Sequence, residues 1–169
     1  MRTLILIIIL SSNSCLLFAQ KQDRVYSVFI LNFAKYIQWP SDKANGDFVI
    51  GVFGNSVIAD ELRSVSSTKT IGTQKILVKD CQSLNETSGC HVVFIAESKS
   101  SFVRDIITKS SLDPTLLITE KEGLASRGGG ISFLLIDGKV RFEINKNSIE
   151  KRGMKIASAL TNLGTVVED

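Results

Sequence analysis

Apolar residues recur at helical spacing in residues 22–38. The positions that share one face of such a helix are Val25, Tyr26, Phe29, Ile30, Phe33 and Ile37. This spacing predicts an amphipathic helix whose apolar stripe packs against the rest of the fold. Pro40 prevents the helix from continuing past Gln38 or Trp39, because proline disfavours helical backbone in the residue before it.

The remaining pattern predicts strands and helices in turn. Apolar runs predict strands at 46–54, 74–80, 90–98 and 114–123, and helical spacing predicts helices at 55–65, 99–111 and 146–164. Asn55 or Ser56 is a suitable cap for the first of these helices. Residues 130–145 predict a hairpin around Asp137-Gly138, a dipeptide favoured in tight turns.

The strands at 46–54 and 90–98 are apolar almost throughout, which is typical of a sheet covered on both faces. We therefore predict an α/β three-layer sandwich. Its central sheet is expected to have five to six mostly parallel strands and an antiparallel hairpin, and to be flanked by helices.

The first nineteen residues have the order of a secretory signal peptide. Arg2 precedes the apolar run 4–10, and a cleavage site follows at Ala19. We expect residues 1–19 to be a signal peptide and residues 20–169 to form a single exported domain. Lipid attachment at Cys15 is the alternative, but the residues before it lack the leucine and small-residue order of such a site.

The charged residues give a formal net charge of +3, and the basic residues are scattered along the chain. Nucleic-acid binding requires a concentrated basic face, which this distribution does not provide. We expect no nucleic-acid partner.

Two cysteines, Cys81 and Cys90, remain after removal of the signal peptide. Export to an oxidising compartment predicts a disulfide between them, closed by the polar loop 82–89. The alternative is a metal site that adds His91, the only histidine. Because neighbours on a strand point to opposite faces, Cys90 and His91 could not share an ion if residue 91 starts a strand.

Candidate catalytic groups are sparse. The only histidine lies beside the predicted disulfide at the entry to a strand, which favours a structural role. Glu120 and Glu122 share one face of a strand end, but Lys121 and Gly123 beside them indicate a solvated end of the strand. We expect no enzymatic activity, no metal and no cofactor.

Three consecutive glycines, Gly128–Gly130, suggest a phosphate-binding loop at first sight. Such loops lead from a strand into a helix, whose amino-terminal N–H groups hold the anion. Here the glycines lead into the apolar run 131–136, which predicts a strand. We interpret them as residues that permit a tight turn or a close backbone approach.

The segment RFEIN, residues 141–145, alternates polar and apolar side chains. Arg141, Glu143 and Asn145 share one face of the strand. Two interpretations stay open. The trio is either an exposed face, with an Arg141–Glu143 pair worth under about 1 kcal/mol, or a group that pins a neighbouring loop or forms part of a docking face.

Five segments, in order, resemble the YfiR/HmsC-type family of exported bacterial domains. They are residues 29–40, 48–54, 89–98, 116–133 and 140–164. The shared features are Cys-His before an apolar strand, Gly and then Gly-Gly before another strand, and RFEIN before a helix. The residues of this signature in the second half of the chain are Gly123, Gly129, Gly130, Arg141, Glu143 and Asn145.

The resemblance implies a non-enzymatic periplasmic protein that binds and represses the periplasmic region of an inner-membrane signalling protein. In better-known members this protein is a diguanylate cyclase, so that repression lowers cyclic-di-GMP and restrains biofilm formation. The resemblance also implies a homodimer and a response to redox state through disulfides. Some members have two disulfides, whereas Cys81 and Cys90 allow only one here. Whether this chain acts as a redox switch therefore stays an open question at this point.

For a contact surface, the sequence favours Tyr36 and Trp39 at the end of the first predicted helix. Both aromatic residues lie off the centre of the apolar stripe, and exposed aromatic side chains often anchor interfaces. We interpret them as contacts to the partner or to a second protomer. The alternative is that both cap the core.

Two further functions compete with the regulatory one. A small-molecule sensor or carrier would hold its ligand in a cleft at the strand ends, where α/β sheets usually bind. An exported enzyme ranks last, since the sequence offers one histidine and no nucleophile–base pair.

Overall fold

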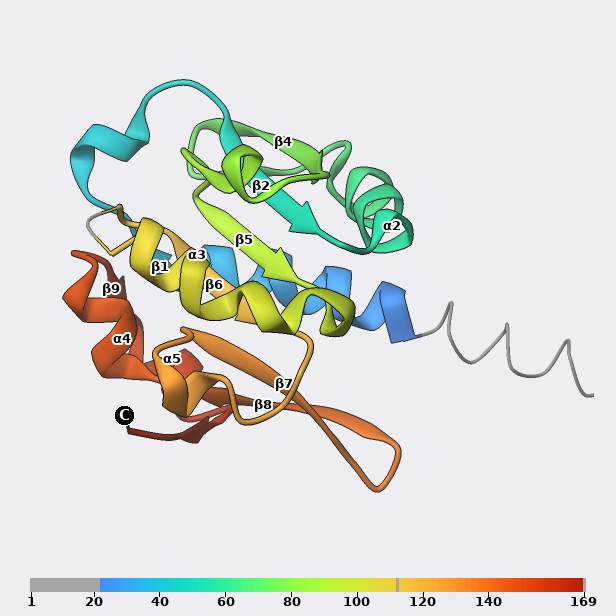
Figure 1. Ribbon diagram of the computed structural model, residues 1–169. Coiled ribbons are helices and arrows are strands. Elements are labelled where there is room, and N and C mark those ends of the chain that lie inside the picture. The colour runs from blue at the N-terminus through green and yellow to red at the C-terminus, as the bar shows by residue number, and fades with distance from the viewer. Residues whose placement is uncertain (1–21, 112, 169) are drawn as a thin grey trace, which may run out of the picture.

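The computed structural model describes residues 22–111 and 113–168, which form an α/β fold with helices on both faces of a central sheet (Figure 1). The predicted signal peptide, residues 1–19, and Cys15 lie outside the described residues. In Figure 1, α3 (Val103–Lys109) covers the viewer's side of the sheet, and the helix of residues 22–36, drawn in blue, lies on the far side. The predicted three-layer α/β class is confirmed.

Eight strands form the central sheet, in the order β10-β8-β7-β6-β5-β2-β4-β3. Their bounds are β2 Phe48–Phe53, β3 Thr70–Ile71, β4 Gln74–Cys81, β5 Val92–Ile95, β6 Leu116–Thr119, β7 Ile131–Ile136, β8 Lys139–Ile144 and β10 Thr165–Val166. Within this sheet, among the residues that the structure describes, only the β3–β4 and β7–β8 pairs are antiparallel. The predicted number of five to six strands is too low because β3 and β10 have two residues each, too few to leave a strand pattern in the sequence.

The helices of the first two thirds of the chain follow the predicted positions. Helix α2 spans Ser56–Ser66, and the Asn55 side chain accepts a hydrogen bond from the Ile58 N–H at 3.2 Å, which confirms the predicted cap. Helix α3 is preceded by the 3-10 helix η3 (Glu97–Phe102). Three more 3-10 helices are η1 (Ser41–Ala44), η2 (Leu84–Thr87) and η4 (Ala125–Arg127).

The predicted helix at 146–164 is wrong. The chain instead forms α4 (Lys146–Lys151), β9 (Lys155–Ile156), α5 (Ser158–Thr161) and then β10. Gly153 adopts φ +79°, a left-handed conformation that ends α4. The following backbone pairs antiparallel with β1 (Ile37–Gln38), so a strand more than a hundred residues earlier decides the local structure.

The hairpin β7–β8 matches its prediction. Asp137 and Gly138 have φ values of +50° and +70°, as a two-residue hairpin turn with both central residues left-handed requires. Figure 1 shows the turn projecting beyond the rest of the sheet.

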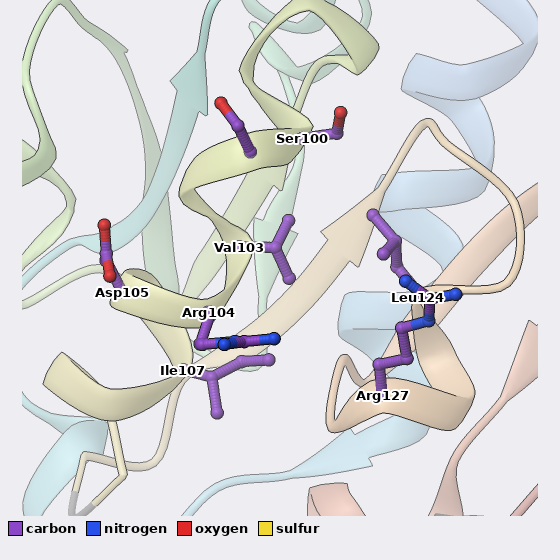
Figure 2. Close-up of a pocket in the computed structure, with 8 residues that line it drawn as sticks. Ser100, Val103, Arg104, Asp105, Ile107, Leu124 and Arg127 are labelled. Atoms are coloured by element: carbon purple, nitrogen blue, oxygen red, sulfur yellow. The ribbon is translucent and has the colours of Figure 1, made fainter.

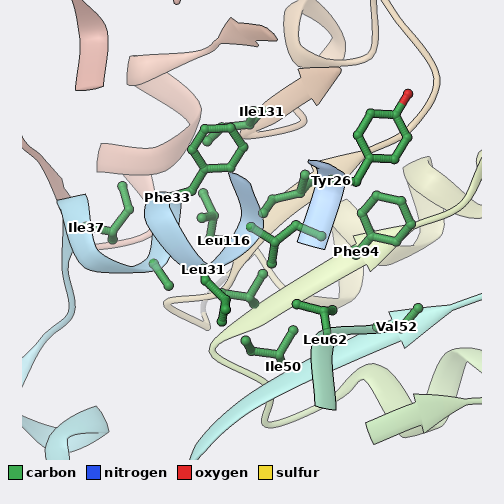
Figure 3. Packing of buried hydrophobic residues seen from close by; sticks show 14 of the residues in the cluster. Tyr26, Leu31, Phe33, Ile37, Ile50, Val52, Leu62, Phe94, Leu116 and Ile131 are labelled. Atoms are coloured by element: carbon green, nitrogen blue, oxygen red, sulfur yellow. The ribbon is translucent and has the colours of Figure 1, made fainter. Parts of the chain in front are cut away.

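Alternate residues of the central strands point into two separate cores. Ile50 and Phe94 face the helix of residues 22–36, while Phe53 and Val93 face α3. The core under the long helix contains stacked and edge-on aromatic rings, such as Tyr26 on Phe133 at 4.3 Å between centroids. Figure 3 shows side chains of this helix packed over those of β2 and β5. The sheet is therefore covered on both faces, as its apolar strands predict.

Candidate functional site: an aromatic groove beside the hairpin

A groove of about 310 Å³ lies where the helix of residues 22–36 meets the hairpin. The helix contributes Phe29, Asn32, Phe33 and Tyr36, β8 contributes Val140, Arg141 and Phe142, and the segment around α5 contributes Leu160 and Leu163. We call it the aromatic groove. It brings together Tyr36 and Arg141, two of the residues singled out in the sequence.

The floor of the aromatic groove is held in place by ring packing. Phe142 meets Phe33 edge-on at 4.8 Å and Phe29 at 5.7 Å between centroids. These contacts follow from the helical spacing of Phe29 and Phe33, which places both rings over β8. The floor is therefore apolar and closely packed.

The rim exposes large apolar side chains. Tyr36 is 38% exposed and Leu163 is 66% exposed. The same apolar face continues along the hairpin, because Phe133 pairs with Phe142 and Leu135 pairs with Val140. Phe133 is buried, whereas Leu135 is 56% exposed. The face thus passes from core to solvent along the hairpin, and the aromatic groove opens onto it.

Trp39, the other predicted contact, lies outside the aromatic groove. Its ring meets Phe48 edge-on at 4.9 Å, and its Nε1–H donates to the Pro114 carbonyl at 3.1 Å. It is partly buried and packs against the core. A role of Trp39 in partner binding stays a prediction, while the contacts in the structure are those of a residue that closes the core.

The glycines of the signature allow close backbone approaches. A Cβ on Gly129 would lie 2.7 Å from the Leu124 carbonyl oxygen, and one on Gly130 would lie 2.9 Å from the Leu117 carbonyl oxygen. Gly123 adopts φ +73°. These glycines fold the loop 120–130 tightly against the sheet before β7 begins.

Asn145 pins that loop. It is fully buried; its Nδ2 donates to the Ala125 carbonyl at 2.9 Å, and its Oδ1 accepts from the Ser148 N–H at 2.8 Å as the cap of α4. Arg152 and Ser148 both donate to the Gly128 carbonyl, at 2.9 and 2.7 Å. One of the two open interpretations of RFEIN, a residue that pins a neighbouring loop, therefore fits Asn145.

Arg141 and Glu143 do not behave as a pair. The ion pairs among the described residues do not include them, although both lie on one face of β8. Arg141 is exposed at the aromatic groove, and one carboxylate oxygen of Glu143 is buried without a hydrogen-bond partner in the described structure.

Cys81 and Cys90 meet above β2. They lie on the two sides of that strand, and a Cβ on Gly51 would lie 2.9 Å from the Cys90 Sγ and 3.2 Å from the Cys81 Sγ. Both are buried thiols in the structure. Both thiols can donate to the Glu86 carbonyl, at 3.5 Å from the Cys81 Sγ and 3.9 Å from the Cys90 Sγ. The interaction of the two thiols with each other raises the pKa of Cys81, together with burial, and lowers the pKa of Cys90. The disulfide between them stays a prediction.

The role of Gly51 was missed in the sequence, although a signal for it exists. A glycine inside an otherwise apolar strand, here FVIGVF, often marks a close approach of other groups.

His91 is engaged through both ring nitrogens. Nδ1 accepts from the Val49 N–H at 3.1 Å, so Nε2 carries the proton and donates to the Lys43 carbonyl at 2.9 Å. Burial is the main reason why the pKa of His91 is lowered below its ordinary 6.5. The ring stacks on Phe48 in the core under the long helix, on the opposite face from Cys90. A shared metal site of Cys81, Cys90 and His91 is therefore ruled out by their directions.

The described residues include neither a metal-binding cluster nor a membrane-spanning helix. Residues 22–111 and 113–168 contain no group of three or more His, Cys, Asp or Glu placed to hold a metal ion. Across the same residues, none of the helices is both long and apolar enough to span a bilayer.

Fold and site together define a small α/β domain whose distinctive surface is an apolar groove. No curated protein matches the chain. The chain belongs to the YfiR/HmsC-like family, whose family model matches residues 23–165. Members of this family are periplasmic regulatory proteins rather than enzymes.

Proposed function

We propose that this chain is an exported, non-enzymatic regulator that binds and represses the periplasmic region of an inner-membrane diguanylate cyclase. Repression would lower cyclic-di-GMP and restrain biofilm formation. On this proposal, residues 1–19 are a cleaved signal peptide and residues 20–169 form the periplasmic domain. Membership of the YfiR/HmsC-like family supports the regulatory role, and the specific target is the part that experiment must establish.

The observation that carries the proposal is the aromatic groove with its exposed rim. Tyr36 and Leu163 are exposed at the rim of a closely packed aromatic floor, and Leu135 is exposed on the adjoining hairpin, where it pairs with Val140. Aromatic and aliphatic anchors of this kind, clustered around a pocket, are typical of protein–protein contacts. We therefore assign the aromatic groove as the surface that contacts the membrane partner or, in the homodimer that we also propose, a second protomer.

The experiment is cross-linking in the periplasm with a photoreactive residue at position 36, followed by mass spectrometry of the captured proteins. Recovery of a diguanylate cyclase with a periplasmic region would support the proposal. Recovery of a different membrane receptor would keep the regulatory role and reject the target. Self-cross-links alone, under conditions where a known complex is captured, would reject the membrane partner and leave the dimer.

Two matched substitutions locate the contact. Leu163→Ser removes an exposed apolar side chain at the aromatic groove, and Val57→Ser removes one that is 54% exposed on α2. We expect Leu163→Ser to weaken capture of the partner and Val57→Ser to leave it unchanged. Equal effects of the two would show that the aromatic groove is not the contact.

We also propose a disulfide between Cys81 and Cys90 in the oxidising periplasm. The two sulfurs lie beside the same residue, at 2.9 Å and 3.2 Å from the position that a Cβ on Gly51 would take, which supports this pairing. Protein purified from the periplasm without reductant should have an intact mass lower by the two thiol hydrogens and should resist alkylation. Full alkylation of both cysteines in unfolded, unreduced protein would contradict the disulfide.

A small-molecule sensor or carrier is the second candidate. The size of the aromatic groove, about 310 Å³, is at the lower end of small-ligand sites. Native mass spectrometry of the protein as purified tests it directly. A retained ligand that is lost in Phe29→Ala would favour this function over protein docking.

A further inference from the structure

A second cavity lies on the face of the sheet covered by α3. It has a volume of about 580 Å³ and separates η3 and α3 from the loop that contains η4 (Figure 2). Its walls include Ser100, Ser101, Val103, Arg104, Leu124 and Arg127. We call it the arginine cleft. The regulatory function proposed above does not use it.

Two guanidinium groups from different elements border the arginine cleft. Arg104 lies on α3 and Arg127 on η4, and both are exposed. Neither has an ion-pair partner among the residues that the structure describes. In Figure 2 the Arg104 side chain extends toward the loop with Leu124 and Arg127, while Asp105 points away from that loop. Asp105 also lines the cleft, so the lining carries two positive charges and one negative charge, and its formal charge is positive.

The arginine cleft also has an apolar floor. Val103 and Leu124 are buried there, and Ile107 is partly buried beside them. Ser100 and Ser101 add two hydroxyl groups that can donate hydrogen bonds. Guanidinium groups, hydroxyl donors and apolar side chains thus line the same cavity.

We propose that the arginine cleft binds a small organic dianion, with two carboxylates on a short apolar body. Each guanidinium can hold one carboxylate through two parallel hydrogen bonds. The hydrocarbon body would lie on Val103 and Leu124 and remove apolar surface from water. The cavity volume is within the range of sites that enclose small ligands. The site does not depend on the proposed partner, so either can fail without the other.

Calorimetric titration of the purified protein with glutarate tests the site, with inorganic phosphate as the comparison anion. We expect glutarate to bind more tightly than phosphate, because phosphate cannot use the apolar floor. Its affinity should fall as salt is added, since the contacts are charged and near the surface. No measurable heat or chemical-shift change with glutarate, or equal affinity for phosphate, would overturn the proposal.

Arginine substitutions locate the binding. Arg104→Gln and Arg127→Gln should each weaken glutarate binding by about tenfold or more, because each removes a charge-assisted pair of hydrogen bonds. Arg63→Gln makes the same change on α2, outside the arginine cleft, and should leave the affinity unchanged. Equal losses in all three would indicate general charge attraction and overturn the site. Thermal unfolding of each variant confirms that it is folded.

A lysine variant separates geometry from charge. Arg104→Lys keeps the positive charge but cannot form the planar fork. We expect it to bind glutarate more weakly than the wild type. An unchanged affinity would overturn the bidentate contact on which the choice of a dicarboxylate rests.

Discussion

The two faces of the central sheet are built differently. The face under the helix of residues 22–36 is a large core with many aromatic contacts, such as Phe33 against Phe142. The face under α3 has a smaller core that contains the two cysteines and is flanked by the arginine cleft. The first face thus supplies most of the apolar burial, while the second carries reactive and charged groups on a smaller apolar base.

This difference suggests a division of roles. Burial of apolar area is the main favourable term in folding, so the larger core should dominate stability. The smaller core should tolerate changes in chemistry at its cysteines with less effect on the fold. Four substitutions or conditions test this comparison.

The largest effect is expected for Phe33→Ala. Phe33 is 1% exposed and meets three aromatic rings, those of Phe29, Phe133 and Phe142. Its loss should lower the free energy of unfolding by about 3–5 kcal/mol through lost burial and a cavity. Ile106→Ala in the smaller core is the matched test. Denaturant unfolding that shows Ile106→Ala to be the more destabilising of the two would reverse the comparison.

Asn145→Ala should cost about 2–4 kcal/mol in unfolding free energy. It removes the cap of α4 and leaves the buried Ala125 carbonyl without its side-chain donor. Asn145→Asp keeps the capping oxygen but puts a carboxylate oxygen in place of the Nδ2 donor to Ala125, so it disturbs the loop contact while the cap is retained. If Asn145→Ala unfolds at the same denaturant concentration as the wild type, the loop is not held by this residue.

Gly51→Ala should destabilise the protein by about 1–3 kcal/mol, since the added methyl would overlap with both cysteine sulfurs. The distances to the Cys90 and Cys81 Sγ atoms are 2.9 and 3.2 Å. The substitution should also slow formation of the Cys81–Cys90 disulfide from reduced protein. Oxidation at the wild-type rate, measured by alkylation and mass spectrometry, would show that the strand can move aside.

The smallest effect is a loss of stability as pH falls below about 6.5. The folded pKa of His91 is lowered, mainly by burial, so the unfolded chain binds the proton more readily. The contribution of His91 is complete above its unfolded pKa and decreases by at most about 1.4 kcal/mol per pH unit below it. The pKa of Glu120 is raised, mainly by burial, so its protonation favours the folded state as pH falls. This effect on the free energy of unfolding opposes that of His91.

His91→Asn isolates that contribution. Unfolding free energies measured between pH 7.5 and 5.5, about one unit on each side of the ordinary histidine pKa, should change less with pH in the variant than in the wild type. Identical slopes would mean that other groups set the pH dependence.

Local patterns in the sequence account for much of the fold. The continuous apolar run in β2, the cap at Asn55 and the turn at Asp137-Gly138 depend on neighbours a few residues away. The helix predicted at 146–164 is wrong for the opposite reason. Its apolar spacing suits a helix, but the pairing of β9 with β1 and the left-handed Gly153 are tertiary effects.

The site shows the same limit. The sequence pointed to Tyr36 and Arg141, but not to Leu163 as their neighbour, because three distant segments meet only in the folded chain. The position of Gly51 beneath the two cysteines has the same origin. The two guanidiniums of the arginine cleft are 23 positions apart, at 104 and 127, and neither belongs to a recognisable motif.

The hairpin has a consequence for solubility. Strand β10 pairs only with Glu143 and Ile144 of β8. The outer edge of residues 139–142 therefore pairs with no strand among the described residues. Bare edges invite pairing with other chains, and positively charged side chains are a common protection. Lys139 and Arg141 stand exposed on this edge. The positive charge of Arg141 in the RFEIN segment thus opposes edge-to-edge pairing with another chain. It does so next to the exposed apolar residues of the proposed docking surface.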